Sequence, residues 1–202
     1  HEPYIPPEEY LDEFSSRKEA FKFNLSTDTD NLSEEELCTL RRLYEGEVKY
    51  VASAIPEFLD FLEDRGLLEN SLVVITADHG EAFWEHGFFG HAFVYDEIIH
   101  VPLIILGSAI NSQKIFSQVG LQSIMPTIMD YLELSMPRSI KSYSLFDERA
   151  YDKAIISVAI DPPFNRKSIA CRFSDFKYII VSALDKRFSY ELLYNLKEDP
   201  HE

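Results

Sequence analysis

The end of one apolar run constrains this chain more than any other feature of its sequence. Residues 71–77 are rich in β-branched side chains and stop abruptly at Asp78, His79 and Gly80. This pattern predicts a buried strand of an α/β sheet, and ligands bind such sheets at the carboxyl ends of their strands. A carboxylate oxygen and an imidazole nitrogen are both metal donors. We therefore predict that Asp78 and His79 bind one divalent cation; the alternative is an aspartate that caps a turn beside a histidine satisfied by backbone.

The segment after this strand concentrates the histidines of the chain. Four of the six histidines lie between residues 78 and 101, among glycines and aromatic residues: His79, His86, His91 and His100. A loop of this composition favours a functional role over a helix. A second buried strand is expected over residues 102–106.

The remaining periodicity predicts an α/β fold. Ser33 and Glu36 form a capping-box pattern before apolar residues at helical spacing, which indicates a long helix up to Gly66. This helix leads into the strand at 71–77, as in a mostly parallel sheet flanked by helices. After residue 150 the pattern changes to four short strands, which predicts a small antiparallel sheet over 154–160, 168–173, 177–182 and 190–194. We expect two domains, 1–149 and 150–202.

Several segments together are similar to a known family. They include T-A-D-H-G-E, E-H-G-F-F-G-H and Y-D-E-I-I-H-V-P-L-I-I in the first half of the chain, H-E-P-Y-I-P-P at its start, Q-S-I-M-P-T-I-M-D-Y-L over 122–132 and E-L-L-Y-N-L-K-E-D-P-H-E at its end. In this order they resemble the carboxyl-terminal portion of the sulfatase family, within the alkaline phosphatase superfamily. The resemblance implies an alkaline-phosphatase-like fold and metal-dependent hydrolysis of sulfate monoesters.

The same resemblance implies roles for individual side chains. Asp78 and His79 would bind the metal, with calcium favoured and manganese or zinc as alternatives. His91 and His1 would be catalytic, binding an ester oxygen and protonating the leaving group. His86 and His100 would support the loop rather than react.

The nucleophile of the family is absent from this sequence. It is a Cys or Ser in C/S-x-P-x-R, oxidised to formylglycine, and it lies upstream of the H-x-P segment together with two further metal-binding aspartates. Cys38 and Cys171 are in neither the right context nor the right order. The chain has no initiator Met, so we expect it to be the later part of a longer polypeptide and inactive alone.

Charge and hydropathy limit the partners. The net charge of −16 argues against nucleic acid and anionic membrane surfaces. No apolar run reaches the length of a membrane span. A sulfate ester, or a phosphate or phosphonate ester, is the expected substrate, whereas compartment and oligomeric state stay open.

Two other functions fit the same segments. One is a phosphodiesterase, phosphonate monoester hydrolase or phosphoethanolamine transferase of the superfamily, which the identity of the upstream nucleophile would distinguish from a sulfatase. The other is a non-catalytic binding module with this fold, which a well-folded chain without metal would favour.

Overall fold

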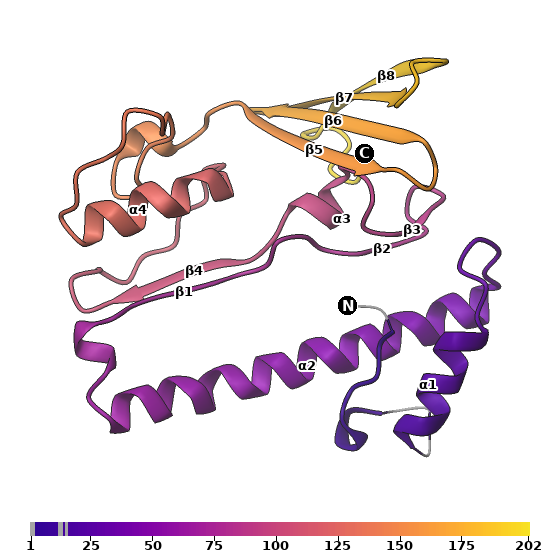
Figure 1. The fold of residues 1–202 in the computed structure, drawn as a ribbon, viewed down its shortest axis with the longest axis horizontal. Coiled ribbons are helices and arrows are strands. Elements are labelled where there is room, and N and C mark those ends of the chain that lie inside the picture. The colour runs from indigo at the N-terminus through magenta and orange to yellow at the C-terminus, as the bar shows by residue number, and fades with distance from the viewer. Residues whose placement is uncertain (1–2, 12–13, 15) are drawn as a thin grey trace. The chain divides into compact units, whose positions relative to one another are not determined.

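The chain folds into two compact units. The computed structural model describes residues 3–11, 14 and 16–202. The first unit extends to Ser71 and includes Glu81–Gly90, while the second comprises Leu72–Gly80 and His91–Glu202 (Figure 1). The histidine-rich loop predicted at 78–101 is thus divided between the two units. The predicted domain boundary after residue 149 stays a prediction.

Helices dominate the first unit. A 3₁₀ turn at Glu8–Tyr10 and the helix α1 (Arg17–Ser26) precede α2 (Glu34–Asp64), which is 31 residues long and contains Pro56. A second 3₁₀ turn covers Leu68–Asn70. Within the part of the chain that the structure describes, no helix is both long and apolar enough to cross a membrane.

The predicted capping box at the start of α2 is confirmed. The Glu36 backbone N–H donates to Ser33 Oγ at 3.3 Å, and the Ser33 backbone N–H donates to Glu36 Oε2 at 2.9 Å. Both donors would otherwise lack partners at a helix N-terminus.

An aromatic cluster forms the core of the first unit. Its buried members are Tyr4, Ala20, Leu40, Leu43 and Phe83, and the partly buried residues packed against them include Tyr44 and Phe89. Phe83 and Phe89 come from the short hairpin strands β2 (Ala82–Phe83) and β3 (Phe89–Gly90), which pair antiparallel. The ring centroids of Tyr44 and Phe83 are 5.2 Å apart and those of Phe83 and Phe89 5.4 Å, within the range of favourable aromatic pairs. The hairpin is therefore anchored by its aromatic side chains.

The second unit begins with the strand that the sequence predicts. That strand is β1 (Leu72–Thr76), and it pairs antiparallel with β4 (Leu103–Gly107), opposite the parallel arrangement expected for this part of the chain. The reason lies in the connection. Two parallel neighbouring strands need a long connection, usually a helix, that brings the chain back to the end of the sheet where the first strand began. In the second unit, the segment between β1 and β4 contains only one short helix, α3 (Asp96–Ile99), which has four residues. The helix α4 (Ile124–Tyr131) follows.

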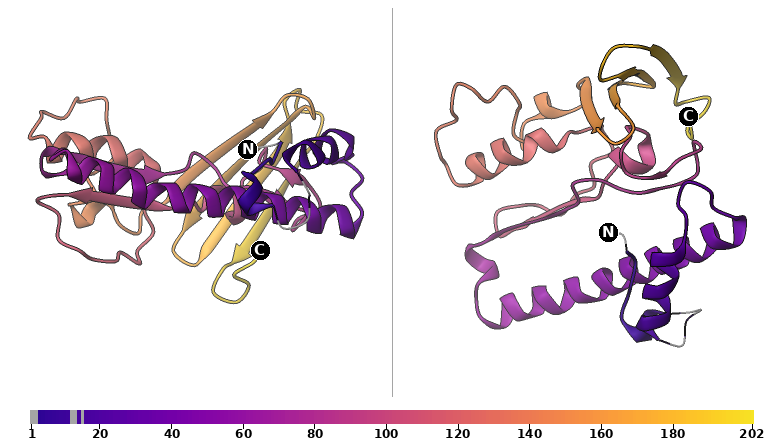
Figure 2. Two further views of the ribbon diagram at one scale, coloured as in Figure 1. Left: turned by 90° about the horizontal axis from the view of Figure 1, so that it is seen from below. Right: turned by 45° about the vertical axis from the view of Figure 1, so that its right-hand side comes forward.

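A four-stranded antiparallel sheet completes the second unit, as the sequence predicts. Its strands lie in the order of the chain, and Figure 2 shows them from two further directions. They are β5 (Ile155–Asp161), β6 (Arg166–Phe173), β7 (Phe176–Ala183) and β8 (Ser189–Asn195). Alternate residues of β7 are buried, so one face of this strand turns toward the interior.

Candidate metal centre and catalytic pocket

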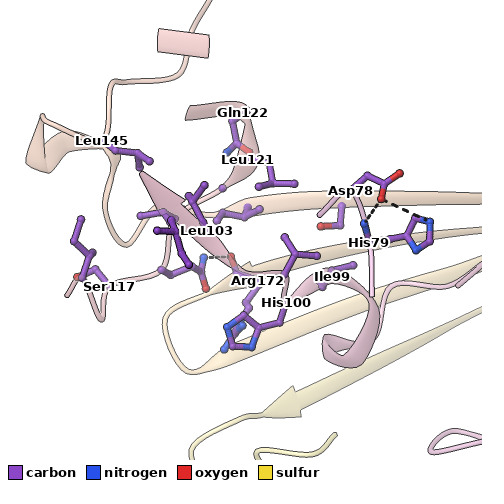
Figure 3. Close-up of a pocket in the computed structure, with 18 of the residues that line it drawn as sticks. Asp78, His79, Ile99, His100, Leu103, Ser117, Leu121, Gln122, Leu145 and Arg172 are labelled. Atoms are coloured by element: carbon purple, nitrogen blue, oxygen red, sulfur yellow. Dashed lines mark hydrogen bonds and ion pairs between the residues drawn. The ribbon is translucent and has the colours of Figure 1, made fainter. Parts of the chain in front are cut away.

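Asp78 and His79 lie just after the carboxyl end of β1. The Thr76 hydroxyl donates to the Pro102 carbonyl at 2.7 Å, which ties the end of β1 to the start of β4. Asp78 Oδ1 accepts the backbone N–H of His79 at 3.1 Å and lies 3.9 Å from His79 Nε2 (Figure 3). The Asp78 side chain is 91% exposed and that of His79 29% exposed. The carboxylate is thus held beside the imidazole and remains accessible.

A backbone contact selects the tautomer of His79. Its Nδ1 lies 2.8 Å from the Gly80 carbonyl oxygen. Because a carbonyl oxygen can only accept a hydrogen bond, Nδ1 carries the proton. Nε2, the nitrogen nearer to Asp78, is then the one with a lone pair for a cation, and such a backbone partner is typical of metal-binding histidines.

His91 lies against His79. The two imidazole rings stack with centroids 4.0 Å apart and planes 17° apart. His91 begins the part of the second unit that follows the hairpin. The structure therefore brings together three of the four side chains selected from the sequence.

These three side chains line one large cavity of the second unit. Its volume is about 1460 Å³. His100 and Arg172 also line it, and much of the remaining wall is apolar and comes from β4, β5 and the segment 110–122. Figure 3 shows Asp78, His79, His100 and Arg172 around this cavity. The named polar lining thus consists of one carboxylate, three imidazoles and one guanidinium.

The other selected residues lie elsewhere. His1 falls outside the described residues. His86 belongs to the first unit, in the turn between β2 and β3, where Trp84 and Gly87 both have positive φ. Glu81, two residues after His79 in sequence, belongs to the first unit, is buried and accepts the Tyr4 hydroxyl at 2.7 Å.

The donor chemistry at Asp78 and His79 fits a divalent cation in part. One carboxylate oxygen and one imidazole nitrogen are positioned for a common cation, and both types bind calcium, manganese or zinc. Among the residues that the structure describes, no group of three or more His, Cys, Asp or Glu could hold a metal ion. The pair can therefore supply only part of a coordination shell.

The sequence reading missed a buried ionic cluster in the second unit. It consists of Asp96, Arg172, Lys177 and Glu202. Lys177 Nζ donates to Asp96 Oδ1 at 2.8 Å and to Glu202 Oε1 at 2.5 Å, and Arg172 lies 3.0 Å from Asp96. One signal was available: Lys177 shares the inward face of its strand with Ile179 and Val181, where a lysine needs buried partners.

The charges of this cluster shift its carboxyl groups in opposite directions. Burial acts to raise the pKa of Asp96, but the hydrogen bond and charge of Lys177 together with the charge of Arg172 outweigh it, so the pKa stays below the usual value. Burial raises the pKa of Glu202 to about 7, despite the opposing effect of Lys177.

Solved structures share this fold. A structure described as being in complex with its substrate D-glucosamine-2-N,6-O-disulfate aligns with a TM-score of 0.65 at 23% identity, covering 94% of this chain and 38% of that one. A 2-O GAG sulfatase aligns with a TM-score of 0.68 at 22% identity, covering 98% and 43%. The phosphonate monoester hydrolase of Agrobacterium radiobacter aligns with a TM-score of 0.70 at 21% identity, covering 84% and 37%. These similarities confirm the predicted α/β, alkaline-phosphatase-like fold class.

Proteins of known name are also similar to this chain in sequence. Arylsulfatase K of Bos taurus is 28% identical over 187 residues, covering 86% of this chain and 34% of the relative. An arylsulfatase of Clostridium perfringens is 28% identical over 169 residues, covering 73% and 35%. The chain thus spans about a third of the length of these relatives. The family described as Sulfatase matches residues 1–134, and the chain belongs to this family.

Proposed function

We propose that this chain contributes part of the active site of a metal-dependent sulfatase that hydrolyses sulfate monoesters. The observation that carries the proposal is the grouping of Asp78, His79 and His91 in one cavity of a chain from the sulfatase family. The curated relatives are named arylsulfatases, which supports a sulfate ester as substrate rather than a phosphate or phosphonate ester.

Asp78 and His79 are the proposed metal ligands. Oδ1 of Asp78 and Nε2 of His79 would hold one divalent cation, with calcium favoured and manganese or zinc as alternatives. When bound, the cation would stabilise negative charge on the sulfate oxygens. The Gly80 carbonyl keeps the proton of His79 on Nδ1 and so keeps the ring ready to bind.

His91 is the proposed general acid. An N–H of its imidazole would bind the ester oxygen and pass its proton to the departing alcohol. Stacking on His79 fixes the ring beside the proposed metal ligands. We propose the same chemistry for His1, by the resemblance of its segment to the family pattern.

The nucleophile is proposed to lie outside the 202 residues, since no C/S-x-P-x-R motif occurs among them. We therefore expect the isolated chain to show no turnover of 4-nitrophenyl sulfate, because loss of a covalent nucleophile removes several orders of magnitude in rate. Metal-dependent turnover by this chain would contradict that placement. In a full-length enzyme that contains the chain, faster hydrolysis of a phosphonate monoester than of a sulfate monoester would favour the phosphonate hydrolase alternative.

A calorimetric titration tests the metal ligands directly. Calcium, manganese and zinc chloride are titrated into a full-length enzyme that contains the chain, into its Asp78→Ala variant and into the control Asp130→Ala, which changes an exposed acid of α4 that does not line the cavity. We expect Asp78→Ala to weaken binding of the preferred cation by roughly tenfold or more, since it removes a donor, and Asp130→Ala to leave it unchanged. Equal affinities in all three proteins would remove the proposed metal site.

A further inference from the structure

The ionic cluster contains a charge that stability alone does not require. Lys177 is fully buried on β7, where its neighbours on the inward face are Ile179 and Val181. Apolar residues that replace a buried ion pair commonly preserve or increase stability, because desolvation of the charges offsets their attraction. A buried ammonium group can instead fix geometry, because its hydrogen bonds determine where its carboxylate partners lie.

The partner that this charge fixes is the first residue of α3. Asp96 receives Lys177 on one carboxylate oxygen at 2.8 Å and Arg172 on the other at 3.0 Å. Two neighbouring strands, β6 and β7, therefore hold the start of α3, and Figure 1 shows this short helix beside the four-stranded sheet. Tyr95 adds a further contact, with its ring 5.9 Å from Lys177 Nζ.

The other end of α3 contacts the candidate metal centre. The Gly80 backbone N–H donates to the Ile98 carbonyl at 2.7 Å. The approach is so close that a Cβ atom at Gly80 would lie 2.1 Å from the Glu97 carbonyl oxygen. Gly80 in turn accepts the proton of His79 Nδ1. A continuous path of contacts thus runs from Lys177 through Asp96 and α3 to the imidazole of His79.

The same helix limits the position of His91. Only four residues separate His91 from Asp96, and three of them are buried. Two of these three, Phe93 and Tyr95, stack with ring centroids 4.7 Å apart. The guanidinium of Arg166, on β6, lies 4.7 Å from the Phe93 ring. The segment between His91 and α3 is therefore fixed to the sheet as well.

We propose that Lys177 is a positioning residue for the candidate active site, acting through Asp96 and α3 to place Gly80 and the imidazole of His79. The inference rests on the proposed function of Asp78 and His79 as metal ligands, but the placement of His79 can be measured without metal. Lys177 touches no reacting group in this scheme.

The test compares two changes on the same inward face of β7. Lys177→Met removes the charge and keeps a long apolar chain, whereas Val181→Ala loses buried volume and leaves the ionic cluster intact. The first readout is the set of imidazole nitrogen resonances of His79 in long-range ¹H–¹⁵N spectra, assigned by their loss in His79→Gln. The second readout is calcium or manganese affinity by calorimetry, measured with each change in a full-length enzyme that contains the chain.

We expect Lys177→Met to shift the His79 resonances and to weaken metal binding by about tenfold or more, in the range typical of residues that orient metal ligands. Val181→Ala should lower stability while both readouts stay as in the original chain. Unchanged resonances and affinity in Lys177→Met would overturn the proposal, as would equal shifts in Val181→Ala. If Lys177→Met does not fold, Asp96→Asn, which keeps the size of the side chain, must reproduce both expected effects or the proposal fails.

The two proposals fail in different ways. If a full-length enzyme that contains the chain binds none of the cations, the proposed metal site is wrong, yet a shift of His79 in Lys177→Met alone would still support the positioning role. If that enzyme binds metal and its Lys177→Met variant binds it equally well, the metal site stands and the positioning role is wrong.

Discussion

The aromatic cluster of the first unit and the ionic cluster of the second differ in the kind of side chain that they bury. The first consists mainly of apolar rings, and the second consists of charged groups. Tyr4, Tyr44 and Phe83 pack ring against ring at centroid distances of 5.2 to 6.0 Å. The ionic cluster instead joins Lys177 to Asp96 and Glu202 through charged hydrogen bonds. The first excludes water from a large apolar surface. The second must balance four charges.

This difference predicts a division of roles. Burial of apolar area stabilises a fold with little dependence on direction or pH. Buried ion pairs contribute less net stability, but they fix geometry and respond to protonation. We therefore expect the aromatic cluster to determine how stable its unit is, and the ionic cluster to determine where Asp96 and α3 lie.

The largest expected effect tests the aromatic side of the comparison. Phe83 is 6% exposed, so Phe83→Ala should lower the free energy of unfolding by about 3–5 kcal/mol, through lost apolar burial and the cavity left behind. Urea denaturation followed by circular dichroism measures this loss at pH 5 and pH 8. The loss should be the same at both values, because no charge is removed.

Phe58 provides the matched control. It lies on α2 in the same unit and is 55% exposed, so Phe58→Ala should cost well under half as much as Phe83→Ala. A small loss in Phe83→Ala, or one that changes strongly with pH, would show that the aromatic cluster is not the apolar core of this unit.

The next effect tests the ionic side. The folded-state pKa of Glu202 is about 7, above its usual value of 4.5, so the folded protein holds this proton more tightly than the unfolded chain does. Its contribution to stability is then complete below pH 4.5 and is lost as the pH rises through 7. Asp96 does not interfere, because its pKa lies below 3.8 and its contribution disappears only in more acidic solution.

Glu202→Gln should therefore flatten the pH dependence. Between pH 5 and pH 8 the original chain should lose on the order of 2 kcal/mol more stability than Glu202→Gln, by the linkage between pKa and folding. The comparison uses urea denaturation over this range, with Glu198→Gln as an exposed control that should follow the original chain. Parallel curves for the original chain and Glu202→Gln would show that Glu202 is not a titrating member of the cluster.

Local signals in the sequence predicted local structure well. Ser33 and Glu36 are three residues apart, so their capping box depends on nothing distant. The strands of the four-stranded sheet follow one another along the chain and pair with their neighbours, which alternation and turn residues are enough to indicate. Asp78 and His79 were selected by a signal of the same local kind, since they are adjacent in sequence at the end of a predicted strand, and their role as metal ligands stays a prediction.

Features that depend on distant pairing could not be predicted in this way. The direction of β4 relative to β1 is set by how the chain turns back between them, and not by the composition of either strand. The partners of Lys177 lie 81 and 25 residues away in sequence. Periodicity can show that a lysine faces inward, but it cannot show which carboxylates meet it.

The smallest expected effect concerns a buried carboxyl group that contacts the aromatic cluster. The Tyr4 hydroxyl donates to Glu81 at 2.7 Å, and both residues are buried. Tyr4→Phe keeps the ring packing and removes this donor, while Glu81 keeps further interactions. The loss should therefore be that of one hydrogen bond, about 1 kcal/mol in urea denaturation at pH 8. Tyr10→Phe, whose hydroxyl bonds to Ser53 in an exposed position, is the control and should cost less. A loss in Tyr4→Phe as large as that in Phe83→Ala would mean that the buried carboxylate, rather than ring packing, controls this unit, and the contrast between the two clusters would no longer hold.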